Sequence, residues 1–295
     1  MTIAEIQLAI ESIEKDALLF EYEAIDKRID TIDFLEFHIL GQLDALLHNS
    51  GGEEILLLKH QAETVKNKLE EINNACYKHI RENIRKGISA SAFKKLVNQY
   101  FPTINHNEYE TAGYDNLDVF INGLFPVQTI PEQTKELEAG MIFYQKTPAR
   151  IVMELVEKAC FKPQDVFFDL GCGLGQVVIL VHLLSGIIAK GIEYEPAFCD
   201  YAAHTAKILN ISNVAFINTD ARYADYAEGT VFFMFTPFTG EILQDVLALL
   251  QKESLLREIT IFTYGPCTPQ VALQKWLYAA ASGYEDDKLH LFKSY

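Results

Sequence analysis

Apolar residues along the first hundred positions recur at spacings of three and four, the period of a helix that buries one face. One stripe runs from Ile6 to Ala24, slips by one position, and resumes from Ile25 to Leu46. A second stripe runs from Ile55 to His79. The segment His48–Gly52 (HNSGG) separates the two, and Asn and Gly commonly end helices. The pattern predicts an all-helical region over 1–100, with two long helices folded back as an antiparallel hairpin.

The pattern changes twice after the hairpin. Residues 88–100 predict a further short helix, and residues 101–140 are richer in Pro, Gly, Asn and acids. We therefore expect a linker region over 101–140 with short elements such as Asn116–Leu124. From residue 141 onward the chain predicts a second domain, 141–295.

Short apolar runs alternate with helical patterns in this second domain. Pro148–Cys160 has helical spacing, with Thr147 as the expected N-cap. The expected strands are 165–170, 189–193, 213–218, 230–235, 258–264 and 288–293, and the expected helices between them are 176–185, 196–209 and 241–253. This alternation predicts an α/β fold with a largely parallel sheet covered on both faces. In such sheets a ligand lies at the carboxyl ends of the strands.

The charge is large and unevenly distributed. The chain has 25 Lys and Arg against 41 Asp and Glu, a net charge of −16. Residues 1–54 carry a net −10 and residues 55–100 a net +5, so the two arms of the hairpin should attract each other. The acidic total disfavours nucleic acid as a partner, although the local +5 leaves it open. We expect the hairpin either to form a homodimer or to cover a substrate.

Cysteine usage and the first residues bear on the compartment. The five cysteines are widely spaced and form no C-x-x-C pair, which predicts neither a disulfide framework nor a metal site. The first twelve residues lack the basic and apolar regions of a signal peptide. No apolar stretch reaches the length of a spanning helix. We therefore expect a reduced cytoplasmic protein without a membrane partner.

One glycine-rich motif joins the first expected strand of the second domain to a helix. It reads Asp169-Leu-Gly171-Cys-Gly173-Leu-Gly175-Gln176. The glycines allow a tight turn and a close approach of a ligand to the backbone. The spacing is Gly-x-Gly-x-Gly rather than the Gly-x-Gly-x-x-Gly of dinucleotide sites, and an acid precedes it. Asp169 would repel a pyrophosphate and favours a ligand with a positive amino group or sulfonium.

Two further acids end the next two expected strands. Glu193 can accept hydrogen bonds from both hydroxyls of a ribose, with Glu195 as the alternative. Asp220 can accept from an adenine amino group while the Ala221 amide reaches a ring nitrogen, with Asp225 as the competitor. Three acids at three successive strand ends predict one site for a nucleoside with a cationic tail.

With these residues in place, the second domain resembles the class I, seven-strand S-adenosylmethionine (SAM)-dependent methyltransferases. Asp169, Gly171, Gly173 and Gly175 match the first motif of that family, and Gln176 follows it directly. The resemblance implies a Rossmann-like sheet, SAM as the cofactor and S-adenosylhomocysteine (SAH) as its product. It also implies that Glu193 binds ribose and that Asp220 binds adenine.

A narrower resemblance links the chain to the non-SET histone lysine methyltransferases. It rests on the stretch DLGCGLGQVVIL and on Tyr144-Gln-Lys-Thr147, where that family has a Tyr-Gly-Glu-Thr loop over the methionine end of SAM. The resemblance implies that Tyr144 and Thr147 cover the cofactor. Lys146 stands in place of that loop's acid, and the fourth strand lacks the family's paired asparagines, so lysine specificity is not implied.

The acceptor side is less defined. Thr236, Pro237 and Phe238 follow the fourth strand, where the resemblance places the methyl group and its acceptor, and Tyr264 is a candidate wall of the same pocket. We identify no general base. The predicted function is SAM-dependent methyl transfer to a protein side chain or a small molecule. The alternatives are a non-catalytic SAM-binding protein and an NAD(P)-dependent oxidoreductase.

Overall fold

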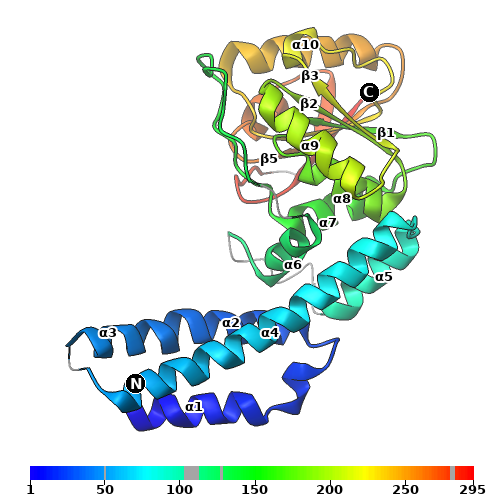
Figure 1. Cartoon of the computed structure of the whole chain (residues 1–295). Helices are drawn as coiled ribbons and strands as arrows, with labels where there is room; N and C mark the ends of the chain where they lie inside the picture. Colours follow the sequence, from blue (N-terminus) through cyan, green and yellow to red (C-terminus); the bar gives the residue numbers. More distant parts are fainter. Residues whose placement is uncertain (50, 103–112, 127–128, 280–282) are drawn as a thin grey trace. The chain divides into compact units, whose positions relative to one another are not determined.

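The chain forms two compact units (Figure 1). The computed structural model describes residues 1–49, 51–102, 113–126, 129–279 and 283–295. Unit 1 comprises Met1–Asn83, Leu96–Ile104 and Tyr114–Phe125, and unit 2 comprises Ile84–Lys95, Asn105–Gly113 and Pro126–Tyr295. The boundaries that the sequence suggests near residues 100 and 140 stay predictions.

Unit 1 is built from helices. The helical elements of this part of the chain are α1 (Ile3–Lys15), η1 (Ala17–Phe20), α2 (Ile25–Asp33), η2 (Phe34–Leu40), α3 (Gly41–Asn49), α4 (Glu53–Arg85), α5 (Ala90–Tyr100) and α6 (Asn116–Leu124). The helices α5 and α6 confirm the expected elements at 88–100 and 116–124. Helix α4 confirms the second long helix.

The first arm of the expected hairpin is not one helix, which corrects the prediction. The Asp16 amide donates to the Ile13 carbonyl at the end of α1, and its carboxylate accepts from the Leu18 amide at the start of η1. The fully buried Arg28 then donates to the carbonyls of Leu19, Glu21 and Tyr22, the 3₁₀ turn and the residues after it. The slip of the apolar stripe between Ala24 and Ile25 coincides with the start of α2. The spacing does not show that the chain leaves the helix already after Lys15, because apolar residues on both sides reach the same core.

Three helical stretches share the core of unit 1. Ile6 and Ile10 of α1, the apolar side chains of η2 and α3, and those of α4 from Ile55 to Leu69 form one buried cluster. The middle stretch changes its winding at η2, a π-helical segment in which the Gly41 amide reaches back to the Glu36 carbonyl. A π segment shifts the phase of the buried face, so Leu35, Ile39 and Leu40 are all buried there.

The charge pattern of the two arms acts as expected. Lys59 of α4 forms an ion pair with Asp44 of α3 at 2.6 Å, and Lys66 of α4 forms another with Glu36 of η2. All four side chains keep contact with solvent. These pairs therefore align the helices more than they stabilise them.

Helix α6 packs within unit 1 although it lies in the region expected to be a linker. The Phe120 ring is fully buried and contacts Tyr77, Tyr100 and Phe101 at centroid distances of 5.2 to 6.1 Å. The Arg81 guanidinium donates to the Gly123 carbonyl at 2.8 Å. The Asp115 side chain caps the helix by accepting from two backbone amides.

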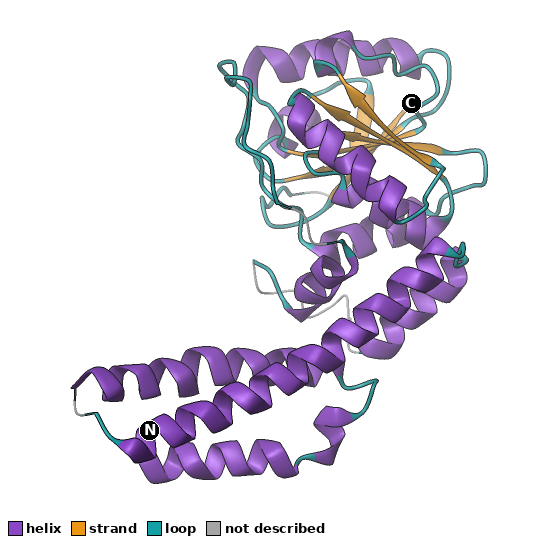
Figure 2. Cartoon of the chain, in the orientation of Figure 1, coloured by secondary structure: helices purple, strands orange, loops and turns teal. Residues whose placement is uncertain are grey.

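Unit 2 contains a seven-stranded sheet with helices on both faces (Figure 2). Its elements are α7 (Ala149–Ala159), β1 (Val166–Leu170), α8 (Gln176–Ser185), β2 (Ile188–Glu193), α9 (Pro196–Ile208), β3 (Val214–Asn218), η3 (Ala221–Tyr223), β4 (Val231–Phe235), α10 (Gly240–Ser254), β5 (Thr260–Tyr264), α11 (Thr268–Ala272), β6 (Leu277–Ala279) and β7 (His290–Ser294). The strand order is β3-β2-β1-β4-β5-β7-β6. All pairs from β3 to β5 are parallel, and β7 is antiparallel to both β5 and β6.

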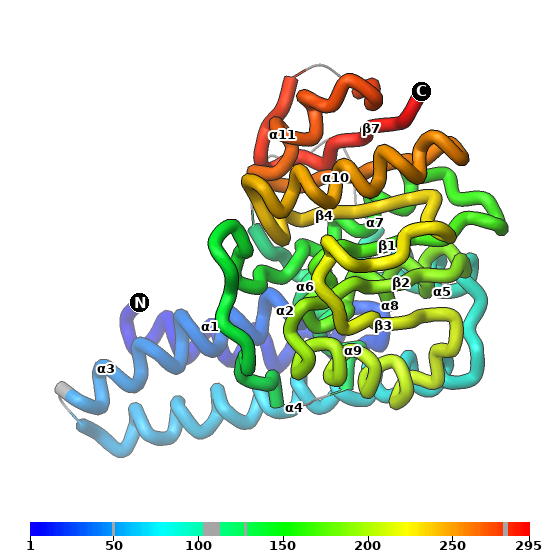
Figure 3. The backbone as a smooth tube through the Cα atoms, turned by 90° about the horizontal axis from the view of Figure 1, so that it is seen from above, coloured from blue at the N-terminus to red at the C-terminus, as the bar shows by residue number. Residues whose placement is uncertain are grey.

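The order of the strands confirms the predicted Rossmann-like α/β fold. Figure 3 shows β3, β2, β1 and β4 side by side in that order. Every strand expected from the sequence is present within two residues, whereas the three-residue β6 is too short for a pattern to predict. Since β1 lies between β2 and β4, its end is the point where the chain order reverses and where ligands bind.

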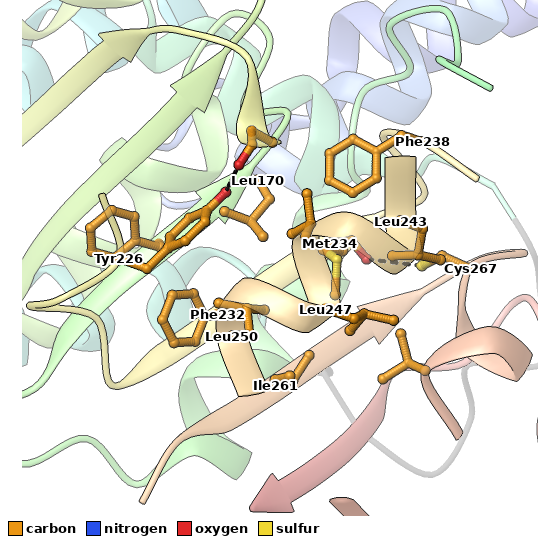
Figure 4. Packing of buried hydrophobic residues seen from close by; sticks show 14 of the residues in the cluster. Leu170, Tyr226, Phe232, Met234, Phe238, Leu243, Leu247, Leu250, Ile261 and Cys267 are labelled. Atoms are coloured by element: carbon orange, nitrogen blue, oxygen red, sulfur yellow. Dashed lines mark hydrogen bonds between the residues drawn. The ribbon is translucent and has the colours of Figure 1, made fainter. Parts of the chain in front are cut away.

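Alternation along the central strands divides their side chains between two layers. Phe168 and Leu170 of β1 and Phe232 and Met234 of β4 pack with buried residues of α10 in one core cluster (Figure 4). Phe167 and Asp169 take the opposite face, where α8 and α9 lie (Figure 1). Across all described residues, no helix is both long and apolar enough to cross a membrane.

Candidate functional site: a cavity at the carboxyl ends of the strands

A cavity, partly open to solvent, lies where β1, β2, β3 and β4 end. One wall is the segment Gln133–Thr147, called the strap below, which supplies nine lining residues. Eleven of the residues that the sequence predicts line this cavity: Tyr144, Thr147, Asp169, Gly171, Gln176, Glu193, Asp220, Ala221, Thr236, Pro237 and Phe238. Gly173, Gly175 and Tyr264 do not line it. Strand order therefore gathers residues that are 94 positions apart in the sequence.

Two glycines of the motif make room for other parts of the protein, and not only for a ligand. Gly171 has φ +79°, and a Cβ there would lie 2.3 Å from the Pro237 Cβ. Gly173 has φ +50°, and a Cβ there would lie 2.3 Å from the Tyr144 ring. Both contacts are shorter than atoms tolerate, so these positions need glycine for conformation and for space. The glycine loop thereby fixes where the strap and the end of β4 can lie.

Asp169 is a buried acid without a partner. Its side chain is 3% exposed, and within the described part of the chain no group donates a hydrogen bond to its carboxylate. Burial, together with the nearby Glu193, raises the pKa of Asp169 to about 8. A buried acid of this kind is stabilised by a cationic ligand.

Glu193 and Glu195 have separate roles, which the sequence leaves open. The Glu193 oxygens accept from the Gly173 amide at 2.7 Å and from the Glu195 amide at 2.8 Å, and each keeps capacity for a further bond. Burial raises the pKa of Glu193. The Glu195 carboxylate is instead engaged by the strap and by α9. Glu193 is therefore the acid that remains able to receive a ligand hydroxyl.

Gln176 begins α8 and adds a donor to the cavity. Its side chain is 8% exposed, and its Nε2 has no hydrogen-bond partner among the described residues. A buried amide nitrogen without an acceptor is costly. Asp169 and Gln176 thus offer an acceptor and a donor, which fit the ammonium and carboxylate of an amino acid such as the methionine end of SAM.

Asp220 is part of a charged pair. The Arg222 Nη2 lies 2.6 Å from the Asp220 carboxylate and 2.7 Å from Glu138 of the strap. This hydrogen-bonded pairing with Arg222 lowers the pKa of Asp220. Ala221 lies beside it, and its carbonyl accepts from the Tyr226 hydroxyl at 2.7 Å (Figure 4). The carboxylate of Asp220 is thus oriented by a guanidinium, and its role toward adenine stays a prediction.

The strap is held against the end of β4 by backbone hydrogen bonds. The Ile142 amide donates to the Pro237 carbonyl at 3.1 Å, and the Thr239 amide donates to the Gly140 carbonyl at 2.7 Å. The Tyr144 ring contacts the Phe198 ring of α9 at 5.7 Å. The strap therefore spans the cavity from β2 to β4.

Thr147 does not cap the following helix, which corrects the prediction. The N-cap of α7 is Pro148, which makes no side-chain hydrogen bond there. Thr147 is buried and lines the cavity instead. The residue before a proline disfavours helical angles, and the helix begins only at Ala149.

The residue after β4, Thr236, has a strained backbone, and its hydroxyl is already engaged in hydrogen bonds within the protein. Thr236 has φ +40°, an unfavourable conformation for a β-branched residue. Its hydroxyl donates to the Tyr264 carbonyl at 3.1 Å and accepts from the Cys267 amide at 3.2 Å. Tyr264 packs on Phe235 at 4.8 Å, so it supports the wall from behind.

Sequence reasoning missed several lining residues. They are Gln133, Leu137, Met141, Ile142, Phe143, Gln145, Lys146, Cys172, Val177, Ile192, Tyr194, Phe198, Thr219, Phe235 and Ile242, with Glu195 named only as an alternative. Seven of them lie on the strap, whose course over the sheet no sequence pattern indicates. The exposure of Ile142, Phe143 and Tyr144, three consecutive apolar residues, is visible only in the structure.

Comparisons with known proteins agree with this site. Residues 127–228 match the family model described as histone methylation protein DOT1. The range covers the strap, the glycine motif and the ends of β2 and β3. No curated protein matches the chain.

Several solved structures are similar to part of the chain. An RNA methyltransferase from Salinibacter ruber, crystallised with SAH, is 22% identical over 51% of this chain and 92% of its own, with a TM-score of 0.42. A precorrin-6y C5,15-methyltransferase from Geobacter metallireducens is 14% identical over 52% and 92%, with a TM-score of 0.41. A SAM-dependent methyltransferase from Geobacter sulfurreducens with SAH is 27% identical over 43% and 53%, with a TM-score of 0.33.

The strand order, the acids gathered at the strand ends and the family-model match lead to one conclusion. The chain carries a class I, SAM-dependent methyltransferase domain of Rossmann-like fold.

Proposed function

We propose that this methyltransferase modifies a protein side chain or a small molecule rather than nucleic acid. The observation that carries the cofactor half of the proposal is the unpartnered buried amide nitrogen of Gln176 in one cavity with two buried acids, Asp169 and Glu193. The net charge of −16 supports the acceptor half, because it repels a phosphate backbone. The description of the matching family, histone methylation, also favours a protein acceptor.

The residues of the cavity would act mainly by alignment. When bound, SAM supplies an electrophilic methyl group. Asp169 and Gln176 hold the amino-acid end, Glu193 holds the ribose, and the strap excludes water. Phe235, Pro237 and Phe238 form an apolar wall on the β4 side of the site, opposite the acids of β2 and β3. Since the Thr236 hydroxyl is engaged by backbone groups, it is not available as a general base.

Two measurements test the proposal. Titration calorimetry with SAH should show binding to the wild type and to Asp225→Asn, an exposed acid outside the cavity, and none to Asp169→Asn. Labelling of a lysate from cells lacking the gene, with tritiated SAM, should then place the methyl group in the protein or the small-molecule fraction. Label confined to nucleic acid would refute the acceptor class, and absence of SAH binding would refute the site.

The second candidate is a SAM-binding protein without transfer activity. The engaged Thr236 hydroxyl favours it, because the residue at the end of β4 then offers no polar side chain to an acceptor. SAH binding without label in any fraction would support this candidate against catalysis.

We also propose a cytoplasmic location and self-association through unit 1. Cysteine spacing supports the first. The second rests on exposed apolar side chains of unit 1, namely Leu8, Phe37 and Leu57, which are 61 to 72% exposed. Sedimentation of the full chain should show a dimer that Phe37→Asp converts to a monomer, and a monomeric wild type would contradict the proposal.

A further inference from the structure

The Glu195 side chain holds the strap by three hydrogen bonds. Its Oε2 accepts from the amides of Thr134 and Lys135 at 2.8 and 2.9 Å, and its Oε1 accepts from the Thr134 hydroxyl at 2.7 Å. Glu195 is 1% exposed, whereas Thr134 and Lys135 are exposed, so each bond joins a buried acceptor to a donor at the surface. Charged acceptors make stronger hydrogen bonds than neutral ones. The carboxylate therefore fixes the position of the strap at this point.

The same side chain caps a helix, and a neighbouring contact reinforces the hold. Glu195 Oε1 accepts from the Ala197 amide at the start of α9 at 3.0 Å. Lys135 donates to the Tyr194 carbonyl at 2.9 Å and lies 4.2 Å from the centre of the Tyr194 ring. Burial works against the charged form, but bonds from Thr134, Ala197 and Lys135 lower the pKa of Glu195 to about 2. The acid is thus ionised at any ordinary pH.

Glu195 also supports the acid that faces the ligand. Its own amide donates to Glu193 Oε1 at 2.8 Å, on the side opposite the Gly173 amide. One residue therefore joins the strap, the start of α9 and the carboxylate of Glu193. Beyond its attachment at Thr134 and Lys135, the strap continues over the cavity to Tyr144.

We propose that Glu195 is a positioning residue, which holds the strap over the cofactor cavity while Glu193 receives the cofactor. The inference rests on the proposed function, since it assigns the strap to the SAM site. It predicts that loosening the hold of Glu195 on the strap speeds the release of the cofactor.

The test uses a substitution that separates the two roles of Glu195. Glu195→Asp keeps the charge and a good helix cap but withdraws the carboxylate from the strap. Thr134→Val removes one strap bond and leaves α9 untouched. Glu253→Asp, on α10 and paired with Arg257, makes the same chemical change away from the cavity and serves as control.

Two readouts of the full chain decide the outcome. In the free protein, amide exchange of the peptide spanning 133–140 should be faster in Glu195→Asp and Thr134→Val than in the wild type and Glu253→Asp. The dissociation rate of SAH should rise about tenfold in both strap variants, a change of about 1.4 kcal/mol. In the double variant, the increase of each rate should be smaller than the product of the two single increases, because both substitutions act on the bond from the Thr134 hydroxyl to Glu195.

Unchanged exchange in Glu195→Asp would overturn the proposal, and so would faster exchange with an unchanged SAH dissociation rate. A wild type that binds no SAH would instead refute the proposed function. Because the exchange measurement needs no cofactor, the two failures are distinguishable.

Discussion

At the scale of single residues, the site is defined by one acid that the fold leaves unsatisfied. Asp169 is buried beside another carboxylate, Glu193, and no described group donates to it. A structural role would supply a donor, as the strap does for Glu195. The free protein therefore stores an unfavourable interaction that a cationic ligand relieves.

The raised pKa of Asp169 predicts a proton released on binding. At pH 7 a carboxyl with a pKa of about 8 is mostly protonated, and the ammonium of SAH favours its charged form. Calorimetry at pH 7 in buffers of different ionisation enthalpy should report release of about one proton per SAH. At pH 9 the release should vanish. A binding heat that is the same in every buffer would contradict the pairing.

The same pKa predicts how the stability of the free protein changes with pH. An acid whose pKa is raised on folding binds its proton more tightly in the folded state, so its contribution is complete below pH 4 and is lost as pH rises through about 8. Asp169→Asn mimics the protonated form. Thermal melting should find the wild type and this variant alike only below about pH 4, and the variant increasingly more stable as the pH rises, by several degrees at pH 9. Parallel curves would show that Asp169 titrates normally.

At the scale of elements, the glycine loop matters because it lets two other segments close over the sheet. A sequence pattern identifies Gly173 as part of a ligand loop, whereas the structure places it beneath the Tyr144 ring of the strap. Contacts between segments also fix the end of β4. There the strained Thr236 donates a hydrogen bond from its hydroxyl to the Tyr264 carbonyl, which joins β4 to the end of β5. The strand ends carry the acidic side chains of the site, and the packing of the loops fixes the shape of the cavity around them.

Gly173→Ala tests this packing role. The new Cβ would meet the Tyr144 ring at 2.3 Å and sit at φ +50°, so we expect destabilisation by about 2 kcal/mol or more and at least tenfold weaker SAH binding. Gly240→Ala is the matched control, since Gly240 has φ +61° with open space around it, and should lose only about 1 kcal/mol.

Adding Tyr144→Ala to Gly173→Ala should recover the part of the stability that the clash removes. Denaturant unfolding of the four proteins of this cycle measures the coupling. If Gly173→Ala and Gly240→Ala lower the free energy of unfolding equally, the close approach of Tyr144 does not contribute to the cost of Gly173→Ala.

At the scale of the whole molecule, charge and apolar burial act in different places. Unit 1 contains most of the acidic excess, and the ion pairs that join α4 to η2 and α3 keep contact with solvent. Its stability comes instead from one apolar cluster that three helical stretches share. In unit 2 the acids that matter are few and buried, and they face a cavity.

A pair of substitutions on α4 separates these contributions. Leu69 is fully buried, so Leu69→Ala should destabilise unit 1 by about 2 to 5 kcal/mol. Lys66→Ala, one turn away, removes the ion pair with Glu36 and should cost less than about 1 kcal/mol. Helicity followed through urea unfolding gives both values. A larger loss in Lys66→Ala would show that charge, not burial, stabilises unit 1.

The sequence by itself determined what depends on neighbours along the chain. Local periodicity predicts the strands of unit 2, and it places acids at the ends of β1, β2 and β3, which parallel strands bring to one edge. The class of cofactor follows from the resemblance that the glycine motif and these acids carry. Only the tertiary structure showed that the helix breaks after α1 and that Thr147 does not cap α7. It also showed that Glu195 holds the strap while Glu193 stays able to bind a ligand. These depend on contacts between segments up to sixty residues apart, and the path of the strap over the cavity leaves no period in the sequence.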